Sequence, residues 1–148
     1  MAENENRIVL KTGYYLDNFT YLLDFVIKNY ADLLSEAEVI FIENFKSLSL
    51  NAQLLYVRLV SRKGPWFILE KILYEEIQSI HQATENLVEN GFLLRNSDID
   101  LKEALTVLTK VEIVSFLKQY YPDININYNC SKSNLIDQLS NAEDKLSL

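Results

Sequence analysis

The chain of 148 residues has 14 lysines and arginines against 21 aspartates and glutamates, a formal net charge of −7, and 49% of its residues are hydrophobic. This length suits one compact domain or two small ones, and the low content of glycine (three) and proline (two) favours a packed, largely helical protein over a disordered one. No apolar run approaches the ~20 residues of a membrane span, and Cys130 has no second cysteine to pair with. We therefore expect a protein of a reducing cytoplasm that does not contact membranes.

The first predicted element is a long helix over residues 14–34. Its apolar side chains recur at the spacing of one helix face, which comprises Tyr15, Phe19, Leu22, Leu23, Val26, Tyr30 and Leu33. Ser35 follows, with Glu38 three residues later, and this spacing is the capping box that starts a helix. We therefore predict a second helix from Ser35 and a helical N-terminal unit over residues 14–48.

A third helix is predicted to start where Ser49 or Asn51 can cap its first turn. We expect it to end at Gly64 and Pro65, because glycine accepts the left-handed conformation of a helix end and proline cannot continue a helix. The next residues, WFIL at 66–69, are aromatic and aliphatic, which predicts a brief strand or an extended turn.

A fourth helix is predicted over residues 74–90, with Gly91 as its C-terminal cap. FLLRN, at residues 92–96, then predicts a second short strand. Two helices alternating with two short strands suit a winged-helix-like unit over residues 49–97, in which a small β-ribbon lies beside packed helices.

Two further capping boxes start predicted helices in the C-terminal part: Asp100 with Glu103, and Thr109 with Glu112. Pro122 stops the second of these helices, an eight-residue polar connector follows, and Ser131 can cap the last helix. The chain is thus predicted to be mainly α, with a tail over residues 1–13, a helical unit over 14–48, the winged-helix-like unit over 49–97, and a linker helix with a helix–loop–helix over 98–148.

Basic residues cluster at one place in this acidic chain. Arg58, Arg62 and Lys63 lie within six positions, and the only tryptophan, Trp66, follows. Cations near a helix C-terminus stabilise the helix dipole without any ligand, whereas the same cations beside an aromatic ring can hold phosphates and stack on a base. The residues alone favour the dipole role for the cations and a core position for Trp66.

No catalytic or metal-binding motif is recognisable. His81 is the only histidine, and Cys130 has no partnering base in the sequence. Pro122-Asp123, followed later by Glu143 and Lys145, matches the sequence motif of metal-dependent nucleases, which is Pro-Asp and then Glu-x-Lys. That chemistry needs its acids on adjacent strands of a sheet, so we interpret the match as coincidence and expect no catalytic residue, metal site or cofactor in this region.

Several stretches together resemble one known family: GYYLDNF, YADLL, LLYVRLVSRKGPWF and LVENGFL. Over roughly residues 13–139 the chain is similar to the N-terminal part of the Fanconi-associated nuclease family, especially its bacterial members with a VRR-NUC catalytic domain. The resemblance implies a structure-specific nuclease for 5′ flaps and crosslinked DNA. Its N-terminal part binds DNA through winged-helix-like and SAP-like elements, and helical repeats and a nuclease domain that uses Mg²⁺ or Mn²⁺ follow. We expect an N-terminal fragment of such a nuclease or a stand-alone relative.

By this resemblance, residues 109–139 look like the SAP unit, although the connector lacks glycine and lysines are few. One hypothesis is a noncatalytic DNA-binding region of a repair nuclease, whose partners are branched or flap DNA and the helical-repeat and nuclease domains of the same protein. Its expected DNA contacts are Arg58, Arg62, Lys63, Trp66 and Lys132. The alternative is an acidic protein-interaction or structural module that docks a catalytic domain or partner without contacting DNA. The resemblance and the clustered cations favour the first hypothesis, and the net charge favours the second.

Overall fold

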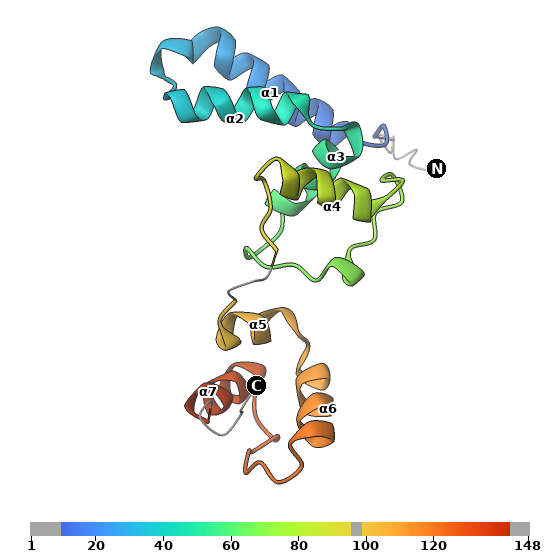
Figure 1. Cartoon of the computed structure of the whole chain (residues 1–148), viewed down its shortest axis with the longest axis vertical. Helices are drawn as coiled ribbons and strands as arrows, with labels where there is room; N and C mark the ends of the chain where they lie inside the picture. The colour runs from blue at the N-terminus through green and yellow to red at the C-terminus, as the bar shows by residue number, and fades with distance from the viewer. Residues whose placement is uncertain (1–9, 96–98, 143–148) are drawn as a thin grey trace, which may run out of the picture. The chain divides into compact units, whose positions relative to one another are not determined.

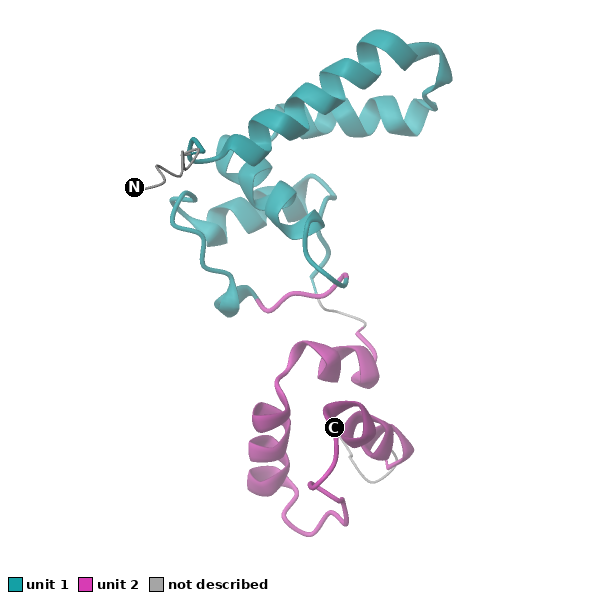
Figure 2. Ribbon diagram, turned by 180° about the vertical axis from the view of Figure 1, so that it is seen from behind, with its two compact units in different colours: residues 1–64, 69–95 teal, residues 65–68, 96–148 magenta. Residues whose placement is uncertain are grey.

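The computed structural model describes residues 10–95 and 99–142 (Figure 1). The chain divides into two compact units, coloured separately in Figure 2: unit 1 contains residues 1–64 and 69–95, and unit 2 contains residues 65–68 and 96–148. All regular structure in the described residues is helical, which confirms the mainly α fold. None of the described helices has the length and apolar character needed to cross a membrane.

Unit 1 begins with a helical hairpin (Figure 1). It consists of α1 (Tyr14–Tyr30), the 3₁₀ turn η1 (Ala31–Leu33) and α2 (Glu36–Ser47). The predicted capping box is confirmed: the hydroxyl of Ser35 accepts from the Glu38 N–H at 3.3 Å, and the Glu38 carboxylate accepts from the Ser35 N–H at 2.7 Å. The chain therefore turns tightly at the tip of the hairpin and restarts as a helix at a defined residue.

The rest of unit 1 is built on two packed helices, α3 (Leu50–Val60) and α4 (Ile80–Glu89), with a 3₁₀ turn, η2 (Leu69–Lys71), between them in the sequence. Ser49 caps α3, and its own N–H donates to the side-chain oxygen of Asn86 on α4 at 3.1 Å. The most deeply buried side chains of this core are Phe45, Ala52, Leu55, Ala83 and Leu87. One core therefore joins the base of the hairpin to the pair of helices.

The third helix is shorter than predicted, because α3 ends at Val60 rather than at Gly64. The Ser61 hydroxyl donates to the Val57 carbonyl at 2.8 Å, and the Arg62 N–H turns back to the Leu59 carbonyl at 3.0 Å. These bonds close the helix with a tight turn. The basic residues that follow therefore lie in a turn and not on a helix face.

The predicted β-ribbon is not formed by the described residues. Residues 66–68 are irregular and Leu69 starts η2, while residues 92–95 contain no strand and residue 96 lies outside the described residues. The winged-helix-like unit expected over residues 49–97 thus has its helices but lacks its wing.

The reason for the missing second strand lies at the end of α4. Gly91 has φ 76, the left-handed conformation expected of a helix cap. Its N–H donates to Val88 at 3.1 Å and the Phe92 N–H donates to Leu87 at 2.8 Å, which together make a Schellman motif. The donor that Phe92 would give to a strand ladder is therefore used to end the helix.

The described residues of unit 2 form three helices: α5 (Leu101–Val107), α6 (Lys110–Tyr120) and α7 (Lys132–Asn141). The capping box of Thr109 and Glu112 and the cap at Ser131 are confirmed. Asp100 precedes α5 without any side-chain cap, so the capping box predicted there is wrong. The buried residues of this unit are Leu105, Ile113, Leu117, Leu135, Ile136 and Leu139.

The connector between α6 and α7 is fixed by side chains rather than by glycine. The Asn127 N–H donates to Oε1 of Gln138 at 2.9 Å, and Nε2 of Gln138 donates back to the Asn127 carbonyl at 3.2 Å. The Cys130 thiol also donates to this carbonyl at 3.0 Å. An amide side chain on α7 thus holds the loop in place.

Candidate nucleic-acid interface

The first expected DNA contact, Arg58, is engaged in an ion pair inside unit 1. Its Nε and Nη2 donate to Oε1 of Glu76 at 2.9 and 2.6 Å, and the hydroxyl of Tyr15 donates to the same oxygen at 2.7 Å. The guanidinium carbon lies 4.3 Å from the ring centroid of Tyr15 and 5.0 Å from that of Tyr74. Arg58 is therefore held by a carboxylate and two aromatic rings from two other segments of unit 1, and we call this arrangement the arginine clamp.

Burial and hydrogen bonding determine how the arginine clamp is charged. Burial raises the pKa of Tyr15 to about 12, and its hydrogen bond to Glu76 adds to this effect. Burial also raises the pKa of Glu76, but the hydrogen bonds from Tyr15 and Arg58 outweigh it and keep that pKa below its usual value. The side chain of Glu76 is only 11% exposed, against 41% for Arg58. At neutral pH the clamp is a neutral tyrosine on an ionised pair, and a phosphate would have to compete with the partly buried Glu76 carboxylate for Arg58.

The raised pKa of Tyr15 predicts an alkaline limit to stability. The unfolded tyrosine titrates near pH 10 and the folded one near 12. The stabilisation by the neutral hydroxyl is thus complete below pH 10 and is lost as the pH rises through 12. It amounts to at most about 2–3 kcal/mol.

Tyr15→Phe cannot titrate, so we expect the difference in urea-unfolding free energy between the wild type and Tyr15→Phe to shrink between pH 10 and 12. A difference that stays constant over this range would contradict the hydrogen bond from Tyr15 to Glu76.

Sequence reasoning missed the arginine clamp because its carboxylate was placed in a helix. Residues 74–79, predicted to begin the fourth helix, instead form turns, and α4 starts only after Ser79, whose hydroxyl accepts from the Gln82 N–H at 3.3 Å. This irregular segment brings Glu76 to Arg58. Arg58 and Glu76 are eighteen positions apart in the sequence, so no helical or strand periodicity could have indicated that they pair.

The other two residues of the basic cluster are placed differently. Arg62 and Lys63 lie in the turn after α3, and both are exposed. Long cationic side chains on an exposed turn can reach a phosphate backbone. These two residues, and not Arg58, are the accessible cations of this stretch.

Trp66 is half-buried, and its indole Nε1 is buried without a hydrogen-bond partner among the described residues. A half-buried ring offers less of its face to a base than an exposed ring does. The stacking role expected for Trp66 stays a prediction.

Lys132 belongs to a pair of lysines that the structure brings together in unit 2. Lys132 is the first residue of α7, and its Nζ donates to the Thr106 carbonyl at 2.6 Å. Lys110 is the first residue of α6, and its Nζ donates to the carbonyl of Cys130, immediately before the Ser131 cap. The starts of α6 and α7 therefore lie within a lysine's reach of each other.

This arrangement, which we call the lysine pair, is suited to an anion. Helix N-termini carry partial positive charge and present backbone N–H groups. Each ammonium has three donors, of which the carbonyl bond uses one. Sequence reasoning identified Lys132 but missed Lys110, although both follow a Thr or Ser cap, and that repeated cap–lysine order is the signal that could have found it.

The solvent face of α4 is unsuited to DNA. The helix contains Glu85 and Glu89 but neither lysine nor arginine. Glu85 is paired with Arg95, and Nε2 of His81 lies 3.9 Å from the carboxylate of Glu85. An acidic helix face repels phosphates, so we expect DNA contacts of unit 1 away from this face.

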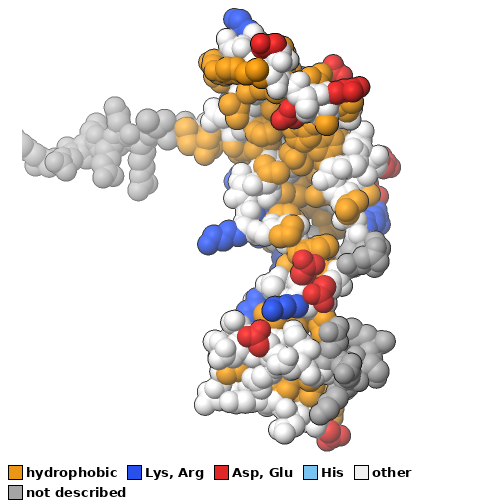
Figure 3. Space-filling model, turned by 90° about the vertical axis from the view of Figure 1, so that its left-hand side faces the viewer, with side chains coloured by type: hydrophobic (Ala, Val, Ile, Leu, Met, Phe, Trp, Pro, Cys, Tyr) orange, Lys and Arg blue, Asp and Glu red, His pale blue; other side chains and the backbone are white. Residues whose placement is uncertain are grey.

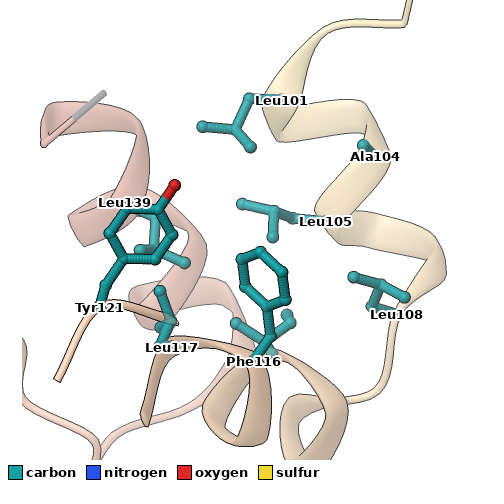
Figure 4. A pocket seen from close by; sticks show the side chains of 9 residues that line it. Leu101, Ala104, Leu105, Leu108, Phe116, Leu117, Tyr121 and Leu139 are labelled. Atoms are coloured by element: carbon teal, nitrogen blue, oxygen red, sulfur yellow. The ribbon is translucent and has the colours of Figure 1, made fainter. Parts of the chain in front are cut away.

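Unit 2 also has an apolar pocket of about 180 Å³ between α5, α6 and α7 (Figure 4). The rings of Phe116 and Tyr121 lie beside Leu101, Leu105 and Leu139 there. Hydrocarbon lining gives a phosphate nothing to bind. The described residues contain no group of three or more His, Cys, Asp or Glu side chains that could hold a metal ion. Glu143 and Lys145, which belong to the match with the nuclease motif, lie outside the described residues.

Comparison with known proteins gives one consistent family. The family model described as "FAN1, HTH domain" matches residues 13–94. The chain is 36% identical over 128 residues to Fanconi-associated nuclease 1 of Homo sapiens, covering 84% of this chain. It is 32% identical over 135 residues to the homologue of Oryza sativa and 34% over 126 residues to that of Pseudomonas aeruginosa, covering 87% and 85% of this chain. The chain spans 12%, 14% and 22% of the length of the human, rice and bacterial proteins.

Solved structures agree with the sequence comparison. The crystal structure of paFAN1 bound to 2nt 5′flap DNA with gap matches with a TM-score of 0.79 and 30% identity, covering 95% of this chain and 26% of that one. The 1nt 5′flap complex matches with a TM-score of 0.77, also at 30% identity, covering 88% and 24%. The resemblance inferred from the sequence is thereby confirmed: the chain belongs to the Fanconi-associated nuclease (FAN1) family and corresponds to its N-terminal region.

Proposed function

We propose that this chain is a noncatalytic DNA-binding region of a structure-specific repair nuclease and that it holds branched or flap DNA by the phosphate backbone. The observation that carries the proposal is the lysine pair, in which Lys110 and Lys132 lie at two neighbouring helix starts. In this proposal unit 2 acts as the SAP-like element. The similar paFAN1 structures, solved with 5′ flap DNA, support the choice of ligand.

Unit 1 contributes a second set of backbone contacts through Arg62 and Lys63. Both follow α3 in an exposed turn, and neither lies on the acidic face of α4. Contacts of this kind position a protein on DNA without reading its sequence, as suits recognition of a branched shape. The helical-repeat and nuclease domains of the same protein, with Mg²⁺ or Mn²⁺, would supply cleavage in the bacterial cytoplasm.

The proposal is tested by the fluorescence anisotropy of a labelled 5′-flap duplex titrated with the chain. We expect binding that weakens steeply between about 50 and 200 mM salt, because released counterions drive phosphate contacts. A plain duplex of the same length is the control and should bind more weakly. A correctly folded chain that leaves the anisotropy of the flap unchanged at the lowest salt would overturn the proposal.

A further inference from the structure

Helix α1 is apolar on two opposite faces. Its core face includes Leu16 and Leu23, which are 7% and 8% exposed. On the other side Tyr14, Tyr21 and Phe25 follow one another at i, i+7 and i+11, and these side chains are 41%, 72% and 44% exposed. A helix packed only against its own core needs one apolar face. The second face is therefore left unexplained by the fold of unit 1.

We call the exposed apolar residues of this side of α1 the outer stripe: Tyr14, Tyr21, Leu22 and Phe25. Leu22, 53% exposed, adjoins Tyr21 and broadens the stripe. At 1.5 Å per residue the stripe extends for about 16 Å, or three helical turns. Figure 3 shows hydrophobic side chains reaching the surface in the upper part of unit 1, beside acidic ones. Single exposed apolar residues are normal, but an aligned group on one helix marks an interaction surface.

The charge around the outer stripe restricts what can cover it. Residues 14–47 contain six acidic and two basic side chains. One of the two basic residues, Lys46, is already paired with Asp24 at 2.6 Å, and Asp17 beside the stripe is paired with Lys11 at 3.5 Å. The hairpin thus carries an excess of four negative charges, or three when Lys11, the partner of Asp17, is counted with it. That excess repels DNA, an anionic membrane surface and a second copy of the same hairpin.

We propose that the outer stripe of α1 binds a helix of a protein partner, with apolar side chains along about three turns and lysines or arginines on both flanks. The apolar centre would bury the stripe, and the basic flanks would match the acidic hairpin. This is the helix-on-helix mode of recognition, with anchors at helical spacing. The site is independent of the proposed DNA contacts, which lie outside the hairpin, so either proposal can fail without the other.

The probe is a designed amphipathic peptide of about 18 residues, long enough for the stripe at 1.5 Å per residue, with leucines on one face and lysines on its flanks. In ¹⁵N–¹H spectra of the full chain we expect it to shift the amides of α1. The control peptide has glutamate in place of every lysine and should not bind. Tyr21→Ser with Phe25→Ser should weaken the lysine peptide by at least about tenfold, the effect of losing one interface anchor.

The matched control variant is Val111→Ser, at a helix position of unit 2 that is 74% exposed, and it should bind the peptide like the wild type. Circular dichroism verifies that the variants fold, and 5′-flap binding should be the same in all of them. Equal binding of the two peptides, or shifts confined to other elements, would refute the docking site. So would a dimer in sedimentation, or binding to anionic phosphatidylserine vesicles, that the double variant abolishes, since these assign the stripe to a second copy or to lipid.

Discussion

Replacing Phe45 with alanine is expected to lower the free energy of unfolding by about 3–5 kcal/mol, the cost of deleting a fully buried ring. Phe45 is 0% exposed and lies at the centre of the aromatic core of unit 1. Its ring centroid is 5.1–6.5 Å from those of Phe19, Phe41, Tyr56 and Phe92. A cavity among four rings cannot close without moving α1, α2 and α3 together. Because a domain has only about 5–15 kcal/mol of stability, the variant should be close to unfolding at room temperature.

The matched control is Phe25→Ala on the same hairpin, where the ring is 44% exposed. A surface substitution of this kind should change the unfolding free energy by no more than about 0.5 kcal/mol. Urea titration followed by circular dichroism measures both variants. Comparable losses in the two would mean that Phe25 is packed in the core and that its face of α1 is not exposed.

Helix starts with a local chemical signal could be predicted to the residue. Ser35 with Glu38 and Thr109 with Glu112 start α2 and α6 as the sequence indicated, because both partners of a capping box lie within one turn. Asp100 with Glu103 has the same spacing, yet it forms no side-chain cap before the seven-residue α5. The spacing permits a capping box but does not enforce it.

Short apolar runs could not be assigned from the sequence. Residues 66–69 and 92–96 have the composition of strands, but three or four apolar residues do not distinguish a strand from a buried loop. At Phe92 tertiary packing decides: its N–H ends α4, and its ring lies 5.2 Å from that of Tyr56 in the core. A strand would have required a pairing partner, which the described residues do not provide.

The candidate DNA contacts could also be predicted only in part from the sequence. The sequence places Arg58 with Arg62 and Lys63 in one basic cluster, but the fold separates them. Glu76 and two tyrosines hold Arg58, whereas the other two cations lie in the exposed turn. Proximity in the sequence therefore predicted a larger basic cluster than the fold forms. It also could not show that Lys110 lies near Lys132 at the starts of α6 and α7.

This separation leads to a prediction for DNA binding. If Arg62, Lys63, Lys110 and Lys132 meet phosphates, replacing all four with glutamine removes up to four contacts. The slope of log affinity for a 5′ flap against log salt should then flatten by up to about 3.6, at about 0.9 per contact. Glutamine retains a donor for the carbonyl bonds of the two lysines, so the fold should survive. Anisotropy at several salt concentrations measures the slope, and circular dichroism verifies folding.

The decisive control within this experiment is the arginine clamp. Arg58→Met with Glu76→Gln removes one charge of each sign and leaves no carboxylate of the clamp without its partner. Because Glu76 occupies Arg58 in the fold, this pair of substitutions should leave the salt slope unchanged. A slope that flattens by about 0.9 would show that DNA displaces Glu76 and that Arg58 is a phosphate contact. An unchanged slope in the fourfold variant would instead show that neither the lysine pair nor the exposed turn contacts phosphates. DNA binding could then not be assigned to these residues.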